Sequence, residues 1–360
     1  MKDIYFVRHG KPDFPTADSY CIGKTDFPLS DIGKIQAALL APSVAELDIK
    51  QAYSSALLRA VETLEILGIE GGNLHELNEA DFGEWDGLSF KQIKSSYPSL
   101  YAQRGEDPTL MPPGAEQYFD LKMRAVSIFE RIEKSANGNV LIVGHRSFFQ
   151  ALFSELFGME PLDAVRLSIP HGSISRIQIN GNIKVPDYIG KVIRPELDET
   201  CCLRILSALG LPENIISHSL AVARFAMDIV AALAAVGVFF DENTIFAAAM
   251  LHDMKRTEPL HALRAFELLG ELGYKEAAEL IKVHHDISEA EEITPEGVLR
   301  VADACILSDK RVSLKKRYME SRKKCKTDEA LIMHTLRYES AVREAEFINK
   351  ALGKDFIDIL

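Results

Sequence analysis

The chain has 360 residues, which at about 150 residues per domain favours two domains. Hydrophobic residues make up 47% of the chain and charged residues 26%, which are ordinary globular values and exclude a disordered chain. The net charge of −12 excludes a protein that binds duplex nucleic acid through a strongly basic surface, so we do not expect a nucleic-acid partner.

The sequence also carries no signal that we would associate with a membrane or with secretion. No uninterrupted apolar run reaches the roughly 18 residues that a membrane span needs. The start, M-K-D-I-Y-F-V-R-H-G, shows neither an apolar signal-peptide core nor a small-residue cleavage site. The 5 cysteines follow no disulfide or zinc spacing. We therefore expect a cytoplasmic protein with no membrane partner.

Residues 1–190 alternate between strand and helix patterns. The patterns predict strands at 4–7 and 139–143, helices at 31–46, 57–67, 117–134 and 147–157, and a hairpin of 174–179 with 183–185. Strands that alternate with helices indicate an α/β domain, in which helices cover a mostly parallel sheet.

A segment with two prolines and a glycine, residues 186–200, separates this part from the rest of the chain. Beyond it almost every segment has the apolar period of a helix. The expected helices are 216–236, 242–254, 260–272, 275–285, 295–308 and 328–352. We therefore expect two domains, 1–190 and 198–360, the second of them all-α.

Two histidines in the first domain follow predicted strands. His9 lies in Arg8-His9-Gly10 and His145 comes directly after V-L-I-V-G, while Arg59 begins a helix. Ligands of open α/β sheets bind at the carboxyl ends of the strands, so we expect both histidines to face one crevice. Phosphoryl transfer through a phosphohistidine needs such an imidazole nucleophile, guanidinium groups on the phosphoryl oxygens and a carboxylic acid for the leaving group.

Four segments carry a closer resemblance: I-Y-F-V-R-H-G, Y-S-S-A-L-L-R-A-V-E-T, L-N-E-A-D-F-G-E-W-D-G-L and V-L-I-V-G-H. They resemble the histidine phosphatase superfamily, which has the phosphoglycerate-mutase-like fold. The resemblance implies that His9 is the nucleophile and that Glu79 donates the proton, with Glu76 or Asp81 as alternative donors. It also implies that Arg8, Arg59 and His145 form the phosphate pocket of the catalytic site. This site is expected to need no metal.

The segments G-K-T-D-F-P-L-S-D-I-G-K and P-P-G-A-E are similar to the alpha-ribazole phosphatase branch of that superfamily rather than to the mutases. Arg146, after His145, departs from the Thr-His-Gly-Gly that is frequent in the family, and Ala115 separates Gly114 from Glu116. These departures leave the chemistry intact and leave the substrate open.

The second domain holds a series of histidines and aspartates within apolar segments. They are His218, His252, Asp253, His261, His284, His285 and Asp303. Asp303 lies in V-A-D-A-C-I-L, where a buried carboxylate is costly unless it is paired or binds a metal. Mixed imidazole and carboxylate ligands suit Mn, Fe, Zn, Ni or Co.

The order His218, His252-Asp253, Asp303 resembles the HD superfamily of metal-dependent phosphohydrolases. The resemblance implies a divalent metal cofactor held by those four residues. His261, with His284 or His285 or both, matches the extended form of the family and implies a second ion. Lys255 stands where the family often has a basic residue and is expected to contact substrate.

The sequence thus indicates a bifunctional phosphohydrolase. The N-terminal domain is expected to hydrolyse phosphomonoesters, and the C-terminal domain a nucleotide or a related phosphoester. Two alternatives are a phosphatase regulated by a non-catalytic nucleotide-binding HD domain and a mutase-type phosphotransferase. We expect small phosphorylated metabolites or nucleotides as partners; the substrates, metal identity, oligomeric state and coupling of the sites stay open.

Overall fold

A computed structural model describes residues 2–360 and divides the chain into two compact units. The first unit ends at Pro195 and the second begins at Glu196. Each unit forms its own core and is described by itself.

The first unit is built on a sheet of six strands in the order β3-β2-β4-β1-β5-β6. The strands are β1 (Lys2–Arg8), β2 (Ile49–Ser55), β3 (Gly72–Leu74), β4 (Asn139–Gly144), β5 (Ile174–Asn180) and β6 (Ile183–Lys191). The pairs β3-β2, β2-β4 and β4-β1 are parallel, and the hairpin β5-β6 adds an antiparallel edge beside β1. The expected α/β architecture with a mostly parallel sheet is confirmed.

The register of the central strands sets the position of the two predicted histidines. Arg8, at the end of β1, lies opposite Gly144, at the end of β4. Because the strands are parallel and neighbours, His9 and His145 leave the sheet side by side at its carboxyl edge. The amide of His9 donates to the Gly144 carbonyl at 3.0 Å, which ties the two strand ends together.

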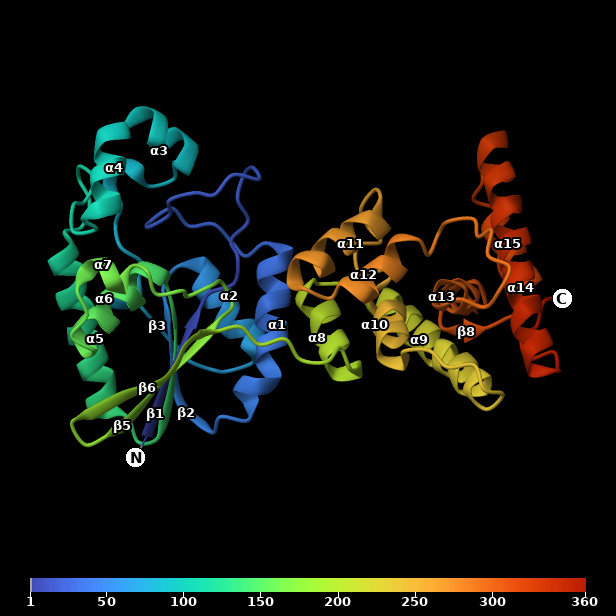
Figure 1. Ribbon diagram of the computed structural model, residues 1–360, viewed down its shortest axis with the longest axis horizontal. Helices are drawn as coiled ribbons and strands as arrows, with labels where there is room; N and C mark the ends of the chain where they lie inside the picture. Colours follow the sequence, from blue (N-terminus) through green and yellow to red (C-terminus); the bar gives the residue numbers. More distant parts are fainter. Residues whose placement is uncertain (1) are drawn as a thin grey trace. The chain divides into compact units, whose positions relative to one another are not determined.

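Helices cover both faces of this sheet (Figure 1). They are α1 (Asp31–Ala45), α2 (Leu58–Leu67), α3 (Phe90–Ser96), α4 (Pro98–Glu106), α5 (Tyr118–Ser135), α6 (Arg146–Leu156) and α7 (Pro161–Ala164), with the short 3-10 turns η1 (His75–Leu77) and η2 (Gly83–Trp85). Side chains of β1 alternate between the two cores: Phe6 packs on the side of α5 and α6, while Val7 packs on the side of α1 and α2.

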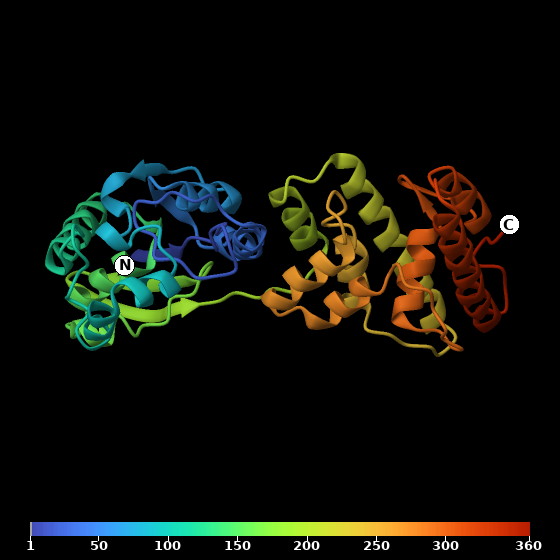
Figure 2. The same cartoon turned by 90° about the horizontal axis from the view of Figure 1, so that it is seen from above.

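The second unit is a bundle of helices with one two-stranded ribbon. Its elements are α8 (Glu199–Ala208), α9 (Glu213–Ala234), α10 (Glu242–Leu251), α11 (His261–Leu272), α12 (Lys275–Lys282), α13 (Pro295–Ala304), β7 (Ile306–Leu307), β8 (Lys310–Arg311), α14 (Leu314–Arg322) and α15 (Asp328–Leu352). Helices α14 and α15 lie together at the end of the bundle that carries the C-terminus (Figures 1 and 2).

Helix α9 bears on the expectation that the chain has no membrane span. By length and composition alone, Glu213–Ala234 could cross a bilayer, although no uninterrupted apolar run had suggested it. Half of its apolar stretch is buried inside the unit, where α9 contacts α10 and α13. A core helix of a bundle meets the same two criteria, so this feature is weak evidence for a membrane span.

Two helices end earlier than their apolar patterns predict, and both ends fall at the candidate metal ligands. Helix α10 ends at Leu251 and α12 ends at Lys282, so His252, Asp253, His284 and His285 lie in turns. Neighbouring side chains on a helix diverge by about 100°. His252 itself keeps helical dihedral angles, φ −56° and ψ −35°, yet its Nε2 lies 3.3 Å from Oδ2 of Asp253, and His284 and His285 lie in one ligand cluster.

Candidate functional site

Three imidazoles meet at the carboxyl edge of the sheet in the first unit. The ring of His9 lies 4.9 Å from that of His145 and 5.3 Å from that of His171, measured between centroids. His9 and His145 are buried. Nδ1 of His9 lies 2.7 Å from the Gly10 carbonyl oxygen, so Nδ1 carries the proton and Nε2 is left with a free lone pair.

The loop after His9 is held against α1 by close backbone contact. A side chain at Gly10 would place its Cβ 2.3 Å from the carbonyl oxygen of Gly33, so only glycine fits. The Gly10 amide also donates to Thr63 Oγ1 at 3.1 Å. These contacts fix the peptide that orients the His9 imidazole.

Arg8 and Arg59 bring guanidinium groups to the same place. Arg8 donates to the Ile169 carbonyl and to Nε2 of His171, both at 2.7 Å. Arg59 is fully buried and donates to the carbonyls of Thr25 and Gly23 at 3.0 and 3.1 Å. The Nε atoms of both arginines are buried without a partner among the described residues. An anion at this edge would supply acceptors that the protein lacks.

Asp86 shapes the loop that holds Arg59. Its carboxylate accepts hydrogen bonds from the amides of Gly23, Lys24 and Thr25 at 2.7 to 3.0 Å. This arrangement turns the carbonyls of the loop towards the guanidinium. Asp86, from the motif D-F-G-E-W-D-G-L, thus holds the loop whose carbonyls bind Arg59.

Glu79 lies at the N-terminus of α6, beside the histidines. Its carboxylate accepts from the amides of Ala80, Ser147 and Phe148 at 2.9, 3.1 and 3.0 Å. The partial positive charge of a helix N-terminus favours an anion there. The two alternative donors are engaged elsewhere: Glu76 pairs with Arg131 at 2.7 Å, and Asp81 pairs with Lys24 at 2.5 Å.

A cavity of about 470 Å³ opens in front of these groups. Arg8, His9, Glu79 and His171 contribute its polar end, and Arg146 also lines it. The remaining wall is largely apolar and aromatic: Phe14, Tyr20, Phe82, Trp85, Phe90 and Met111. Such a cavity can hold a phosphorylated molecule with an apolar portion.

The electrostatics of this site favour neutral imidazoles beside charged guanidiniums. Burial, and then the charges of His145 and Arg59, hold the pKa of His9 well below its usual range. Burial, Arg59 and Arg8 do the same for the pKa of His145. Burial lowers the pKa of Arg8 to about 9, which leaves it a cation at neutral pH. A neutral imidazole can act as a nucleophile.

In the second unit six of the seven predicted ligands gather in two clusters. His218, His252 and Asp303 form one cluster, and His261, His284 and His285 form the other; the potential ligand atoms within each cluster lie within 4.8 Å of one another.

Asp253 stands between the two clusters. Its Oδ2 lies 3.3 Å from Nε2 of His252 and 3.8 Å from Nε2 of His218. Its Oδ1 lies 3.6 Å from Nε2 of His261. One carboxylate therefore offers an oxygen to each cluster.

Backbone carbonyls orient these imidazoles. Nδ1 of His218, His252 and His284 lies 2.7, 2.8 and 2.6 Å from the carbonyl oxygens of Ser308, Ala249 and Ile281. Each Nδ1–H donor leaves Nε2 as the ligand atom, the arrangement typical of metal-binding histidines.

Buried polar atoms without partners test whether a metal fits. Nε2 of His252, Nε2 of His284 and Oδ1 of Asp253 are buried and unpartnered among the described residues. Burial alone would lower the pKa of His252, but the neighbouring Asp253 and Asp303 raise it to about 9. A divalent cation would replace that proton and bind the three unpartnered atoms. These donors therefore fit a metal.

Two basic residues follow the His252-Asp253 turn. Lys255, predicted to contact substrate, forms an ion pair with Glu258, and its role stays a prediction. Arg256 instead pairs with Asp253. A guanidinium thus contacts the carboxylate that lies between the two clusters.

Sequence reasoning missed three residues of the first site: His171, Asp86 and Arg124. Arg124 donates to the carbonyls of Glu76 and Asn78 at 2.7 and 2.9 Å, and so supports the segment that leads to Glu79. His171 lies in I-P-H-G, directly before the hairpin, and a histidine beside a proline and a glycine at a strand start was the available signal.

Two known protein families match the two units of the chain. Residues 4–188 match the histidine phosphatase superfamily (branch 1), and residues 215–308 match the HD domain. The chain belongs to the histidine phosphatase superfamily and carries an HD domain, so it is a hydrolase of phosphoric esters. HD domains are typically metal-dependent, in line with the two ligand clusters.

Individual relatives match the first unit. The glucosyl-3-phosphoglycerate phosphatase of Mycolicibacterium vanbaalenii is 26% identical over 196 residues, which cover 51% of this chain and 86% of the relative. The 6-phosphofructo-2-kinase/fructose-2,6-bisphosphatase 3 of Rattus norvegicus is 30% identical over 42% of this chain and 27% of its own. Bacillus stearothermophilus YhfR shares the fold, with a TM-score of 0.50 and 23% identity over 53% of this chain and 98% of its own. Placement in the alpha-ribazole phosphatase branch stays a prediction.

Proposed function

We propose that the first unit hydrolyses phosphomonoesters through a phosphohistidine at His9. The observation that carries the proposal is the His9 tautomer: with its proton on Nδ1, the imidazole presents a free Nε2 lone pair near the charges of Arg8 and Arg59. Nε2 attacks phosphorus while the P–O bond to the leaving group breaks. Arg8, Arg59 and His145 stabilise the charge on the phosphoryl oxygens.

Glu79 then handles the protons. In its acid form it protonates the leaving oxygen as the P–O bond breaks. In the second step a water molecule attacks the phosphohistidine, the N–P bond breaks, and the Glu79 carboxylate takes the water proton. Phosphate leaves and His9 returns to its neutral form. The apolar wall of the cavity supports small phosphorylated metabolites as substrates.

We propose that the second unit is a metal-dependent phosphohydrolase with two ions. A divalent metal supplies a Lewis acid that polarises a phosphoryl group and acidifies water. His218, His252 and Asp303 would hold one ion, His261, His284 and His285 the other, and Asp253 would bridge them. A nucleotide or related phosphoester would be the substrate.

A panel of phosphorylated metabolites tests both proposals. Wild type, His9→Ala and Asp253→Ala are assayed with and without chelator. His9→Ala should lose one set of activities that chelator does not affect, and Asp253→Ala should lose a second set together with its metal. His75→Ala, at an exposed position, is the control. Full phosphomonoesterase turnover by His9→Ala, or a wild type that retains none of Mn, Fe, Zn, Ni and Co, would contradict the respective proposal.

Transfer to a second substrate hydroxyl instead of water would favour the mutase alternative. Metal content without turnover of any nucleotide would favour the alternative in which the HD domain only regulates.

A further inference from the structure

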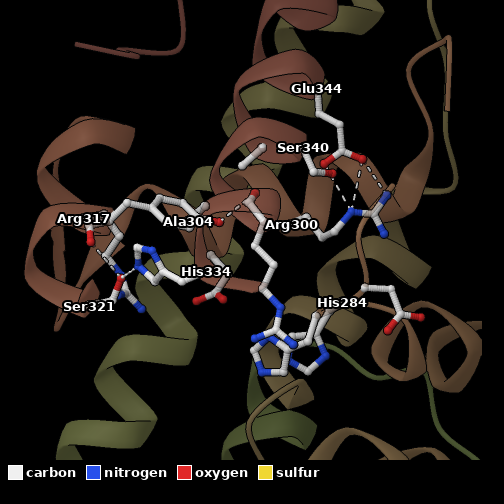
Figure 3. Close-up of a pocket in the computed structure, with 14 residues that line it drawn as sticks. His284, Arg300, Ala304, Arg317, Ser321, His334, Ser340 and Glu344 are labelled. Carbon is white, nitrogen blue, oxygen red and sulfur yellow. Dashed lines mark hydrogen bonds and ion pairs between the residues drawn. The ribbon is translucent and has the colours of Figure 1, made fainter. Parts of the chain in front are cut away.

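A second cavity, of about 190 Å³, adjoins the metal-ligand clusters in the second unit (Figure 3). His284, His285 and Asp303 form one part of its wall. The rest of the wall comes mainly from α14 and α15, which lie beyond the segment that matches the HD domain. Water takes about 30 Å³ per molecule in the liquid, so the cavity has room for a phosphoryl group and a few further atoms.

The arginines on this wall differ in what they bind. Arg300 is engaged by a carboxylate: it holds Glu344 with contacts of 2.6 to 3.2 Å, a pair that Figure 3 shows, and it also donates to the Val283 carbonyl. Arg317 donates only Nε, to the Ile306 carbonyl at 2.8 Å. Neither Arg317 nor Arg337 forms an ion pair with a carboxylate within residues 2–360. Two cations therefore line the cavity with donors to spare.

Polar groups at the same cavity add directed donors. Oγ of Ser321 lies 2.8 Å from Nε2 of His334, and Figure 3 shows this pair on the wall. Burial, and then the charges of Arg322, Arg337 and Arg317, lower the pKa of His334. The cavity wall also carries the carboxylates of Asp286, Asp303 and Glu344, of which Glu344 is paired with Arg300 and Asp303 belongs to a metal-ligand cluster.

We infer that this cavity binds the phosphoryl group of the substrate beside the two metal ions, with Arg317 and Arg337 on its oxygens. The inference rests on the proposed metal-dependent hydrolase and names the residues that would recognise its substrate. A guanidinium offers two parallel donors to phosphoryl oxygens, which suits this task better than a lysine would. Helices α14 and α15 thereby become the substrate-recognition part of the unit.

The test uses inorganic phosphate as the probe and the Mn²⁺-loaded full chain. Phosphate held beside the Mn²⁺ ions should show strongly enhanced ³¹P relaxation, and the Zn²⁺-loaded protein gives the diamagnetic background, including phosphate bound in the first unit. Arg337 is exposed, so Arg337→Ala should fold and keep its metal. We expect it to bind the relaxing phosphate about tenfold more weakly. Lys316→Ala, an exposed cation of α14 outside the cavity wall, should match wild type.

The outcomes separate the inference from the hydrolase proposal. An Arg337→Ala protein with wild-type Mn²⁺ content and undiminished phosphate relaxation would overturn the inference. Arg337-dependent phosphate binding in a protein that hydrolyses no phosphoester would support the phosphoryl-binding cavity and overturn the hydrolase proposal.

If the chain holds no metal, the hydrolase proposal fails, and the imidazole resonances of His334 then report on the cavity. Phosphate should shift them in wild type, and Arg337→Ala should need about tenfold more phosphate for the same shift; no shift in wild type would overturn the inference. Displacement of phosphate by glycerol 3-phosphate or by a nucleoside monophosphate identifies which carrier of the group fits.

Discussion

Arg124 forms two hydrogen bonds to Glu116, Nε to Oε1 at 2.9 Å and Nη2 to Oε2 at 2.8 Å. The same guanidinium holds the carbonyls of Glu76 and Asn78, and it lies over the ring of Phe148, whose amide donates to Glu79. Arg124 touches the supports of the proposed proton donor on both sides. It is therefore a positioning residue for Glu79.

Arg124→Met should reduce phosphomonoesterase kcat by about ten- to a hundredfold, because a displacement of about 1 Å in a catalytic group has effects of that size. The KM should change little, since Arg124 lines no part of the cavity. Arg131→Met removes only an exposed ion pair with Glu76 and should leave kcat unchanged. A loss confined to thermal stability, with kcat intact, would show that Arg124 is structural alone.

Glu79→Gln should slow phosphoenzyme formation most for substrates with poor leaving groups. An alkoxide needs a proton as it leaves, whereas a nitrophenolate leaves without one. Rapid-quench measurement of phosphoenzyme from an alkyl phosphate and from nitrophenyl phosphate checks this. Equal losses for the two substrates would contradict the assignment and point back to Glu76 or Asp81.

The low pKa values of His9, His145 and His171 predict how stability depends on pH. Burial is the main cause in each case, so all three stay neutral in the folded chain at a pH where they would bind protons when unfolded. The unfolded state then binds more protons below about pH 6.5, and the free energy of unfolding must fall as pH falls. The limiting slope for three histidines is about 4 kcal/mol per pH unit.

Trp85 allows this to be measured in the full chain. It is the one tryptophan of the sequence and is buried in the first unit, so its fluorescence reports the unfolding of that unit. His171→Asn should reduce the slope by about 1.4 kcal/mol per pH unit below pH 6.5. His75→Asn, at an exposed position, is the matched control. A slope that does not respond to His171→Asn would refute the assigned protonation state.

Local patterns predicted most of the fold but not where helices stop at the ligands. The helix Asp328–Leu352 has the bounds that its pattern predicts, and Thr327 caps its start. Helix α10 was expected to continue to Met254, because A-A-A-M-L continues into the apolar Met254 without a helix-breaking residue. The helix ends at Leu251, and the side chain of His252 beyond it lies 3.8 Å from Asp303, a residue distant in sequence that no local pattern identifies.

The same limit applies to the residues that the motifs left out. His9 and His145 could be predicted because each follows an apolar strand. His171 reaches the site only because the hairpin β5-β6 pairs beside β1, where the Gly172 amide lies 3.1 Å from the carbonyls of Arg8 and His9. Arg317 and Arg337 lie in different helices, and no motif of the sequence links them. Their meeting at one cavity depends on the packing of α14 on α15.

The two ligand clusters predict that each of the two metal ions can be removed without the other. His261→Ala should remove one of two ions, because it deletes a member of the cluster with His284 and His285. His218→Ala should remove the other. Asp253→Asn should weaken both, since its two oxygens lie towards different clusters, and metals prefer the charged carboxylate.

Elemental analysis after dialysis measures these equivalents. The expected order is two ions for wild type, about one for each histidine variant, and fewer than one for Asp253→Asn. The phosphatase activity that depends on His9 should be unchanged in all of them, because its site uses none of these ligands.

Asp303→Asn is the discriminating variant: its Oδ1 lies 3.1 Å from Nε2 of His218 and belongs to one cluster only. It should therefore behave like His218→Ala. An Asp303→Asn protein that loses both ions, or an Asp253→Asn protein that keeps one at full occupancy, would show that Asp253 does not bridge two sites.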